Sequence, residues 1–215
     1  MTAIGAARSG VVRSADVEAM GRQPGAGAER RQLRPTDVKR LNRMWRRRTE
    51  SRLALLVESV TQPFNVGQIV RTAAAFGVER LWLAGNAAPP THQGARKTAL
   101  GTERLVPWEH AGTPAAAAQA ARAAGFRLVA IELTGDAAPL HEATLDGDVC
   151  LAVGGEDHGC SPALLAAADA VAYIPQVGRV GSLNVAVAAA VALAEARRRE
   201  WAAAGAARGS AGAGG

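Results

Sequence analysis

Three short polar stretches, each directly after an apolar run, hold the residues of this 215-residue chain best suited to chemistry. Amides, hydroxyls, carboxylates and guanidinium groups can bind and orient a polar ligand through hydrogen bonds and charge. Their placement after apolar runs suggests a common location in the fold. The first stretch is TQPFN at 61–65, which contains Asn65 and is followed by Arg71. The second is GGEDHG at 154–159, which contains Glu156, and the third is GRVGSLN at 178–184, which contains Ser182 and Asn184.

Each stretch also has a purely structural interpretation. Asn65 could cap the helix that follows it, Arg71 could face solvent, and Ser182 could cap the last helix. The second stretch, GGEDHG at 154–159, could be a tight turn with Glu156 exposed. It is not a dinucleotide fingerprint, because G-x-G-x-x-G requires glycine where Glu156 stands, and this disfavours a nicotinamide-dependent oxidoreductase. A shared position at strand ends favours one common site over separate structural roles.

Apolar runs alternate with helical patterns along most of the chain. Near-continuous apolar strands between helices predict an α/β fold, with a mainly parallel sheet covered by helices on both faces. In such a sheet the polar stretches meet at the edge formed by the carboxyl ends of the strands, where ligands bind. Thr113 before Pro114 and Ser161 before Pro162 are predicted helix caps. Strands are predicted at 52–60, 80–85, 127–133, 149–155 and 170–175, and helices at 65–78, 113–126, 161–168 and about 183–201.

The excess positive charge lies in the first quarter of the chain. Residues 1–50 hold 12 Lys and Arg against 5 Asp and Glu, whereas residues 51–215 carry a net charge of −1. The segment VKRLNRMWRRRTE predicts a basic helix within 31–50. Its arginines suit phosphate, which favours binding of a polyanion, most plausibly nucleic acid, over a merely solubilising face. Its narrow apolar stripe with the single aromatic Trp45 disfavours a membrane surface. The predicted nucleic-acid-binding residues are Arg40, Arg43, Arg46, Arg47 and Arg48.

Composition sets further expectations. Residues 1–30 and 202–215 are rich in small and polar residues without a sustained period, so both are predicted to be disordered tails. The sequence has no signal-peptide pattern and no apolar run long enough to span a membrane, which predicts a cytoplasmic protein. Cys150 and Cys160 lack partners at metal-ligand spacing, so we expect buried or incidental thiols and no metal.

The three stretches together resemble the motifs of the SpoU/TrmH family of RNA ribose 2'-O-methyltransferases, within the SPOUT superfamily. The first motif resembles NVGQIVRTAAAFGV, the second LAVGGEDHG and the third IPQVGRVGSLNVAVA. The resemblance implies a SPOUT methyltransferase domain at 51–201 with a deep C-terminal trefoil knot. The chain departs from the pattern at Ala186, where many relatives have serine, and its N-terminal extension is too short for the folded RNA-binding domain of several rRNA-directed relatives.

The resemblance also implies a cofactor and residue roles. S-adenosylmethionine (AdoMet) would lie bent in the knot, and no metal would be needed. Family proposals make Arg71 the base, but a guanidinium with a pKa above about 12 suits an electrostatic role at least as well. The implied cofactor-binding residues are Ile131, Gly154, Ile174 and Leu183, and the implied catalytic residues are Arg71, Asn65, Glu156, Ser182 and Asn184.

Partners and substrate follow from the same resemblance. It implies a homodimer in which Arg71 completes the partner's site. The layout of a catalytic domain with short extensions resembles the tRNA-directed branch, so the D-loop guanosine of tRNA is the preferred target. An rRNA target, or a catalytically silent RNA-binding protein with this fold, remains an alternative.

Overall fold

A computed structural model describes residues 32–212 of the chain, with side chains for residues 32–205. The chain divides into two compact units, Met1–Arg48 and Thr49–Gly215. The predicted disordered tail at 1–30 lies outside the described residues. The larger unit contains all three polar stretches.

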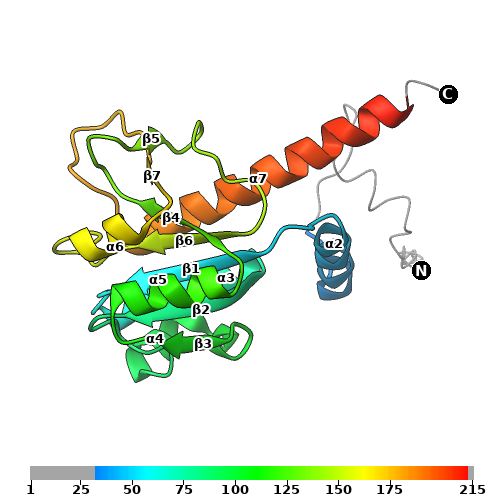
Figure 1. Cartoon of the computed structure of the whole chain (residues 1–215). Helices are drawn as coiled ribbons and strands as arrows, with labels where there is room; N and C mark the ends of the chain where they lie inside the picture. The colour runs from blue at the N-terminus through cyan, green and yellow to red at the C-terminus, as the bar shows by residue number, and fades with distance from the viewer. Residues whose placement is uncertain (1–31, 213–215) are drawn as a thin grey trace, which may run out of the picture. The chain divides into compact units, whose positions relative to one another are not determined.

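The larger unit is built on one seven-stranded sheet (Figure 1). The strand order is β3-β2-β1-β6-β4-β7-β5, and every neighbouring pair is parallel. The carboxyl ends of all strands therefore lie along the same edge. The strands are β1 (Leu53–Glu58), β2 (Val78–Ala84), β3 (Trp108–His110), β4 (Arg127–Ile131), β5 (Ala138–Pro139), β6 (Val149–Val153) and β7 (Ala170–Tyr173).

Helices cover both faces of this sheet. Successive side chains of a strand point to opposite faces, so Leu55 and Val57 of β1 join one buried cluster while Ala54 and Leu56 join another. The first cluster includes residues of α3, α4 and α7, and the second includes residues of α5 and α6. The prediction of a parallel α/β sheet covered on both faces is confirmed. The helices are α3 (Pro63–Ala75), α4 (Gln93–Ala99), α5 (Pro114–Ala123), α6 (Pro162–Ala167) and α7 (Val185–Gly212), with a short 3₁₀ helix, η1 (Thr102–Arg104).

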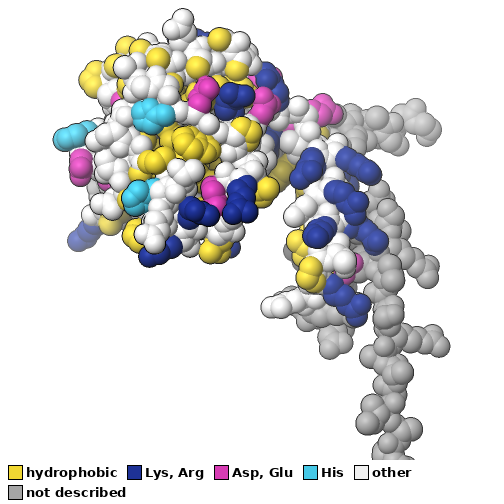
Figure 2. Space-filling view, turned by 90° about the horizontal axis from the view of Figure 1, so that it is seen from below, with side chains coloured by type: hydrophobic (Ala, Val, Ile, Leu, Met, Phe, Trp, Pro, Cys, Tyr) yellow, Lys and Arg dark blue, Asp and Glu magenta, His cyan; other side chains and the backbone are white. Residues whose placement is uncertain are grey.

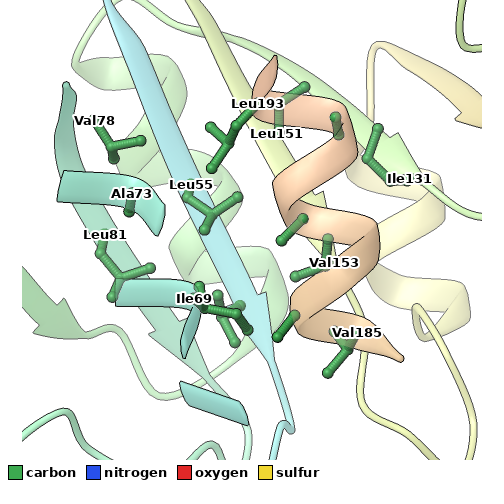
Figure 3. Close-up of a cluster of buried hydrophobic side chains, with 14 of the residues drawn as sticks. Leu55, Ile69, Ala73, Val78, Leu81, Ile131, Leu151, Val153, Val185 and Leu193 are labelled. Atoms are coloured by element: carbon green, nitrogen blue, oxygen red, sulfur yellow. The ribbon is translucent and has the colours of Figure 1, made fainter. Parts of the chain in front are cut away.

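The first cluster holds the beginning of α7 against the sheet. Figure 3 shows Leu55 of β1 and Leu151 of β6 gathered with Ile69 of α3 and Leu193 of α7, and all four are fully buried. Each such leucine or isoleucine contributes about 1.5–3 kcal/mol through burial. The packing fixes the first turns of α7 beside the strand ends, where the third polar stretch leads into the helix.

The predicted strands and helices of the larger unit are all present, and their ends are shifted by a few residues except at the end of α7. The caps are confirmed, since the Thr113 hydroxyl accepts a hydrogen bond from the Ala116 amide and the Ser161 hydroxyl from the Leu164 amide, each at 3.2 Å. Sequence reasoning missed α4, β3 and β5. The two strands have only three and two residues, and α4, with the sequence QGARKTA, has no apolar period to reveal it.

The end of the last helix differs from the prediction. The sequence analysis placed a disordered tail at 202–215, but α7 continues to Gly212, so the prediction is wrong for residues 202–212 (Figure 1). Alanine has the highest helix propensity, and extending an existing helix avoids the cost of a new nucleus. The alanine-rich composition that suggested disorder therefore also permits helix.

The smaller unit contains the amphipathic helix α2 (Pro35–Arg47). None of its described residues is buried, and Val38 is 40% exposed. The guanidinium carbon of Arg48 lies 5.3 Å from the centre of the Trp45 ring, a cation–π contact. Figure 2 shows Lys and Arg side chains gathered over this helix. Among residues 32–212, no helix combines the length and apolar content needed to cross a membrane.

Candidate functional site

Hydrogen bonds join the three polar stretches at the carboxyl edge of the sheet. The Asn65 amide nitrogen donates to Glu156 Oε1 at 2.5 Å, and the Asn184 amide nitrogen donates to Asn65 Oδ1 at 3.1 Å. These residues are 91 and 119 positions apart along the chain. They follow β1, β6 and β7, so the predicted convergence of the stretches is confirmed.

The network ends on the first turn of α7. Asn184 Oδ1 accepts hydrogen bonds from the amides of Ala186 at 2.9 Å and Val187 at 3.4 Å, which is the pattern of a helix N-cap. Asn184 rather than Ser182 therefore caps this helix. Asn65 is also not a cap, because α3 begins at Pro63, two residues before it. Both of these structural interpretations from the sequence are wrong.

A cavity of about 630 Å³ opens beside this network. Its wall comes from the ends of β4, β6 and β7 and from the segment that leads into α7. It is large enough for a nucleoside-sized ligand, since ligand pockets commonly measure about 300–1,000 Å³. The lining includes all four predicted cofactor-binding residues, Ile131, Gly154, Ile174 and Leu183, and three predicted catalytic residues, Glu156, Ser182 and Asn184.

The floor of the cavity is a glycine turn that leaves no room for side chains. A Cβ added to Gly154 would lie 1.9 Å from the carbonyl carbon of Gly159 and 2.2 Å from the Cys160 nitrogen. Gly155 and Gly159 form an antiparallel bridge, and Gly159 has a φ of 64°. Backbone thus packs directly on backbone, which leaves main-chain groups at the cavity surface.

Two carboxylates attach this turn to the sheet. Glu132 Oε2 accepts a hydrogen bond from the Cys160 amide at 2.8 Å, and Glu58 Oε2 accepts one from the Ser161 amide at 2.9 Å. Glu58 is 4% exposed, so its carboxylate is held inside the protein by this contact. The sequence analysis did not single out either residue. Both could have been recognised in the sequence, because each is an acidic residue at the end of an otherwise apolar predicted strand.

Neither cysteine has the properties of a nucleophile. Cys150 and Cys160 are free and buried, as the sequence predicts, and burial raises the pKa of both thiols. The nearby carboxylates of Glu132 and Glu58 raise the pKa of Cys160 further. Both side chains therefore stay protonated near neutral pH. Within residues 32–205, no three His, Cys, Asp or Glu side chains are grouped so as to hold a metal ion.

Arg71 does not line the 630 Å³ cavity within one chain. It is exposed on α3 and lines a second cavity of about 480 Å³, whose wall includes Val187 and Val191 of α7. Val185 and Ala188 of α7 line the first cavity instead. With 3.6 residues per turn, these positions lie on different faces of the helix, so α7 separates Arg71 from the first cavity.

The chain that forms this site matches a known protein family. The family model described as "SpoU rRNA Methylase family" matches residues 52–194. The chain belongs to the SpoU methylase family. The matched region contains the glycine turn, the asparagine network and both cavities.

Curated and solved SpoU relatives are similar over most of this chain. A 23S rRNA (guanosine-2'-O-)-methyltransferase, RlmB, of Acinetobacter baylyi is 34% identical over 148 residues, 68% of this chain and 60% of the relative. A tRNA (guanosine(18)-2'-O)-methyltransferase of Escherichia coli K12 is 33% identical over 172 residues, 78% and 72% of the two chains. The crystal structure of an AdoMet-bound rRNA methyltransferase from Sinorhizobium meliloti aligns with a TM-score of 0.65 and 31% identity, covering 70% of this chain and 57% of that one.

The SpoU relatives differ in length from this chain. The chain spans 56% of the length of a tRNA/rRNA methyltransferase from Synechocystis and 60% of the length of the Acinetobacter enzyme. Relatives whose names specify tRNA and relatives whose names specify rRNA show nearly equal identity to it. Membership of the SpoU family therefore leaves the choice of RNA open.

Proposed function

We propose that this protein transfers a methyl group from AdoMet to a ribose 2'-hydroxyl of RNA. The observation that carries the proposal is the 630 Å³ cavity, which is lined by all four residues assigned to the cofactor and bordered by the Asn65–Glu156–Asn184 network. The SpoU family match and the AdoMet-bound relative support the same activity. An RNA substrate also agrees with the cytoplasmic location that the sequence predicts.

The cavity fits AdoMet in its chemistry. Ile131, Ile174 and Leu183 offer apolar surface to a purine ring, and Gly154 lets backbone groups approach the ligand closely. When bound, AdoMet supplies an activated methyl group on a sulfonium, so the transfer needs no metal. We further propose that the C-terminal segment forms the deep trefoil knot implied by the family. The lining of one cavity by both 154–159 and 178–184 supports this arrangement.

The protein's own groups then have two tasks, to orient the ribose hydroxyl and to stabilise its oxygen as negative charge develops. Ser182 lines the cavity and is suited to hold the ribose. Asn65 and Asn184 hold the loops in place through their hydrogen bonds, with Glu156 fixing the Asn65 amide. We assign Arg71 an electrostatic role, because a guanidinium rarely gives up its proton in proteins.

The separation of Arg71 from the cavity supports a homodimer. If Arg71 acts in the reaction, it must reach a cavity other than its own chain's. The neighbouring face of α7 exposes Val187 at 46% and Val191 at 38%, which gives a second copy an apolar surface to cover. We therefore propose that Arg71 of each chain completes the cavity of its partner.

The preferred substrate is tRNA, with the D-loop guanosine as target, and rRNA is the alternative. Arg71→Ala is expected to lower methyl transfer by about 10²–10³, because one group that stabilises transition-state charge is lost. AdoMet affinity should stay unchanged, because the role assigned to Arg71 is to stabilise the ribose oxygen as negative charge develops and not to hold the cofactor. The measurements are transfer of labelled methyl to tRNA and to rRNA, mapping of the modified ribose, and calorimetry with AdoMet.

The outcomes separate the candidate functions. If methylation maps to rRNA alone, the substrate is rRNA and not tRNA. AdoMet binding without methylation of either RNA would favour the catalytically silent protein. Absence of AdoMet binding would overturn the proposed activity altogether.

We also propose that α2 binds RNA through the basic residues predicted from the sequence. Replacing Arg43, Arg46 and Arg47 with glutamine should weaken RNA binding and reduce the slope of log affinity against log salt by about 2–3, because each lost phosphate contact contributes about 0.7–0.9. AdoMet affinity is the control and should not change, because α2 lies outside the unit that contains the cavity. An unchanged slope for RNA would contradict the role of α2. Arg40 and Arg48 belong to the same proposed surface.

A further inference from the structure

The second cavity is a basic groove between α3, α4 and α7. Two of its lining side chains, Arg71 of α3 and Lys97 of α4, carry positive charge, and none of the lining residues is acidic. Both cations are exposed, so they are accessible to a ligand within one chain. The complete lining is Gln68, Arg71, Thr72, Lys97, Thr98, Ala186, Val187, Ala190 and Val191.

A glycine on α3 permits the close packing of the two helices that carry the cations. A Cβ added to Gly67 would lie 2.0 Å from Thr98 Oγ1 and 2.1 Å from the Ala95 carbonyl oxygen, so only glycine permits this approach of α3 and α4. The Thr98 hydroxyl also donates to the Phe64 carbonyl of α3 at 2.9 Å. Lys97 precedes Thr98 in the chain, so these contacts fix the part of α4 from which Lys97 lines the same groove as Arg71.

The positive charge of the groove is not neutralised by the described residues. Within residues 32–205, neither Arg71 nor Lys97 has an ion pair. Arg96, the neighbour of Lys97 on α4, differs because its Nε lies 3.7 Å from Glu103 Oε1 and it does not line the groove. Two unpaired positive charges on the wall of one groove favour an anionic ligand there.

We propose that Lys97 and Arg71 together bind a phosphodiester of the substrate RNA. Arginine can grip two phosphate oxygens at once, and lysine adds a point charge on a flexible stem. Gln68 and Thr72 provide further hydrogen-bond donors along the same wall. Lys97 thereby acts as a binding residue that holds the RNA backbone where Arg71 acts. The assignment rests on the proposed RNA methyltransferase function.

The groove also agrees with the proposed dimer. Its α7 side is aliphatic and contains Val187 and Val191, the surface assigned to the second copy. Its α3 and α4 side holds the cations. The phosphodiester would therefore be bound at the border between the two copies, where Arg71 serves the partner's cavity.

The test compares Lys97→Gln with Arg96→Gln in the full-length chain. The two variants lose the same charge from the same helix, but only Lys97 lines the groove. Binding of tRNA or rRNA, whichever the wild type methylates, is measured at several salt concentrations. Lys97→Gln is expected to weaken binding by about tenfold at low salt and to reduce the salt slope by about 1, whereas Arg96→Gln stays within about twofold of wild type.

Two further measurements distinguish loss of the phosphate contact from loss of the dimer. Lys97→Arg should restore the salt slope, and light scattering should give the same oligomeric state for Lys97→Gln as for wild type. Equal slopes for Lys97→Gln and wild type, or a loss of RNA binding that follows loss of the dimer, would overturn the phosphodiester site. Failure of the wild type to bind AdoMet would instead overturn the proposed function, so the two failures are distinguishable.

Discussion

Replacing Arg197 with methionine is expected to lower the melting temperature of the larger unit by about 6–20 °C. The Arg197 side chain is 3% exposed and donates to the carbonyl oxygens of Ser51, Phe76 and Gly77 and to Glu200 Oε2. These four hydrogen bonds measure 2.9, 3.0, 3.3 and 2.7 Å respectively. They connect α7 to Ser51, two residues before β1, and to the two residues that follow α3.

The size of the effect follows from burial. Methionine keeps much of the volume but leaves buried carbonyl oxygens and one carboxylate oxygen without their partner, and breaking a buried pair costs about 3–5 kcal/mol. In a domain of this size each kcal/mol lowers the melting temperature by about 2–4 °C. Thermal unfolding followed by circular dichroism is the appropriate measurement.

The neighbouring arginine provides a matched control. Arg198 is 61% exposed and its Nε pairs with Glu195 Oε2 at 2.7 Å on the helix surface. Exposed pairs contribute only about 0–1 kcal/mol, so Arg198→Met should change the melting temperature by a few degrees at most. Equal destabilisation by the two variants would mean that loss of charge or helix propensity, rather than the buried contacts, determines the effect.

The second large effect is expected at the cavity floor. Gly154→Ala should weaken AdoMet binding by about 5- to 150-fold, because the turn must shift to make room for the methyl group and restoring the cavity for AdoMet then costs about 1–3 kcal/mol. The atoms that the new Cβ would meet are backbone atoms of Gly159 and Cys160. They cannot rotate away, so the turn itself must move.

Calorimetry with AdoMet and thermal unfolding test this prediction together. Gly135→Ala is the control, because a Cβ at Gly135 has no heavy atom within 4 Å. That variant should bind AdoMet like the wild type. Unchanged AdoMet affinity in folded Gly154→Ala protein would show that the glycine turn is not part of the cofactor site.

Local patterns made much of this fold predictable. Apolar strands, alanine-rich helices and the caps at Thr113 and Ser161 depend on interactions between near neighbours, so they can be read from the sequence. Short elements without a pattern, such as α4 and β3, could not be recognised in this way. They are stabilised by packing against the rest of the domain, and α4 in particular depends on its contact with Gly67.

Of four predicted site residues, three could be placed in the fold from the sequence and one could not. Asn65, Glu156 and Asn184 could be assigned to one edge because parallel strands bring their carboxyl ends together, and the structure joins them by hydrogen bonds. The position of Arg71 could not be assigned from the sequence, because it depends on which face of α7 meets α3. The roles of these residues in catalysis remain predictions.

The sequence by itself determined the order of the longer strands and helices along the chain and the polar stretches that follow the strands, because periodicity and capping act over a few residues. The tertiary structure alone decided that Glu58 and Glu132 hold the glycine turn and that Lys97 and Arg71 line the same groove. The contact of Glu58 spans 103 residues and that of Glu132 spans 28. Such contacts form only when distant segments pack together, since no local pattern specifies which distant residue a side chain will meet.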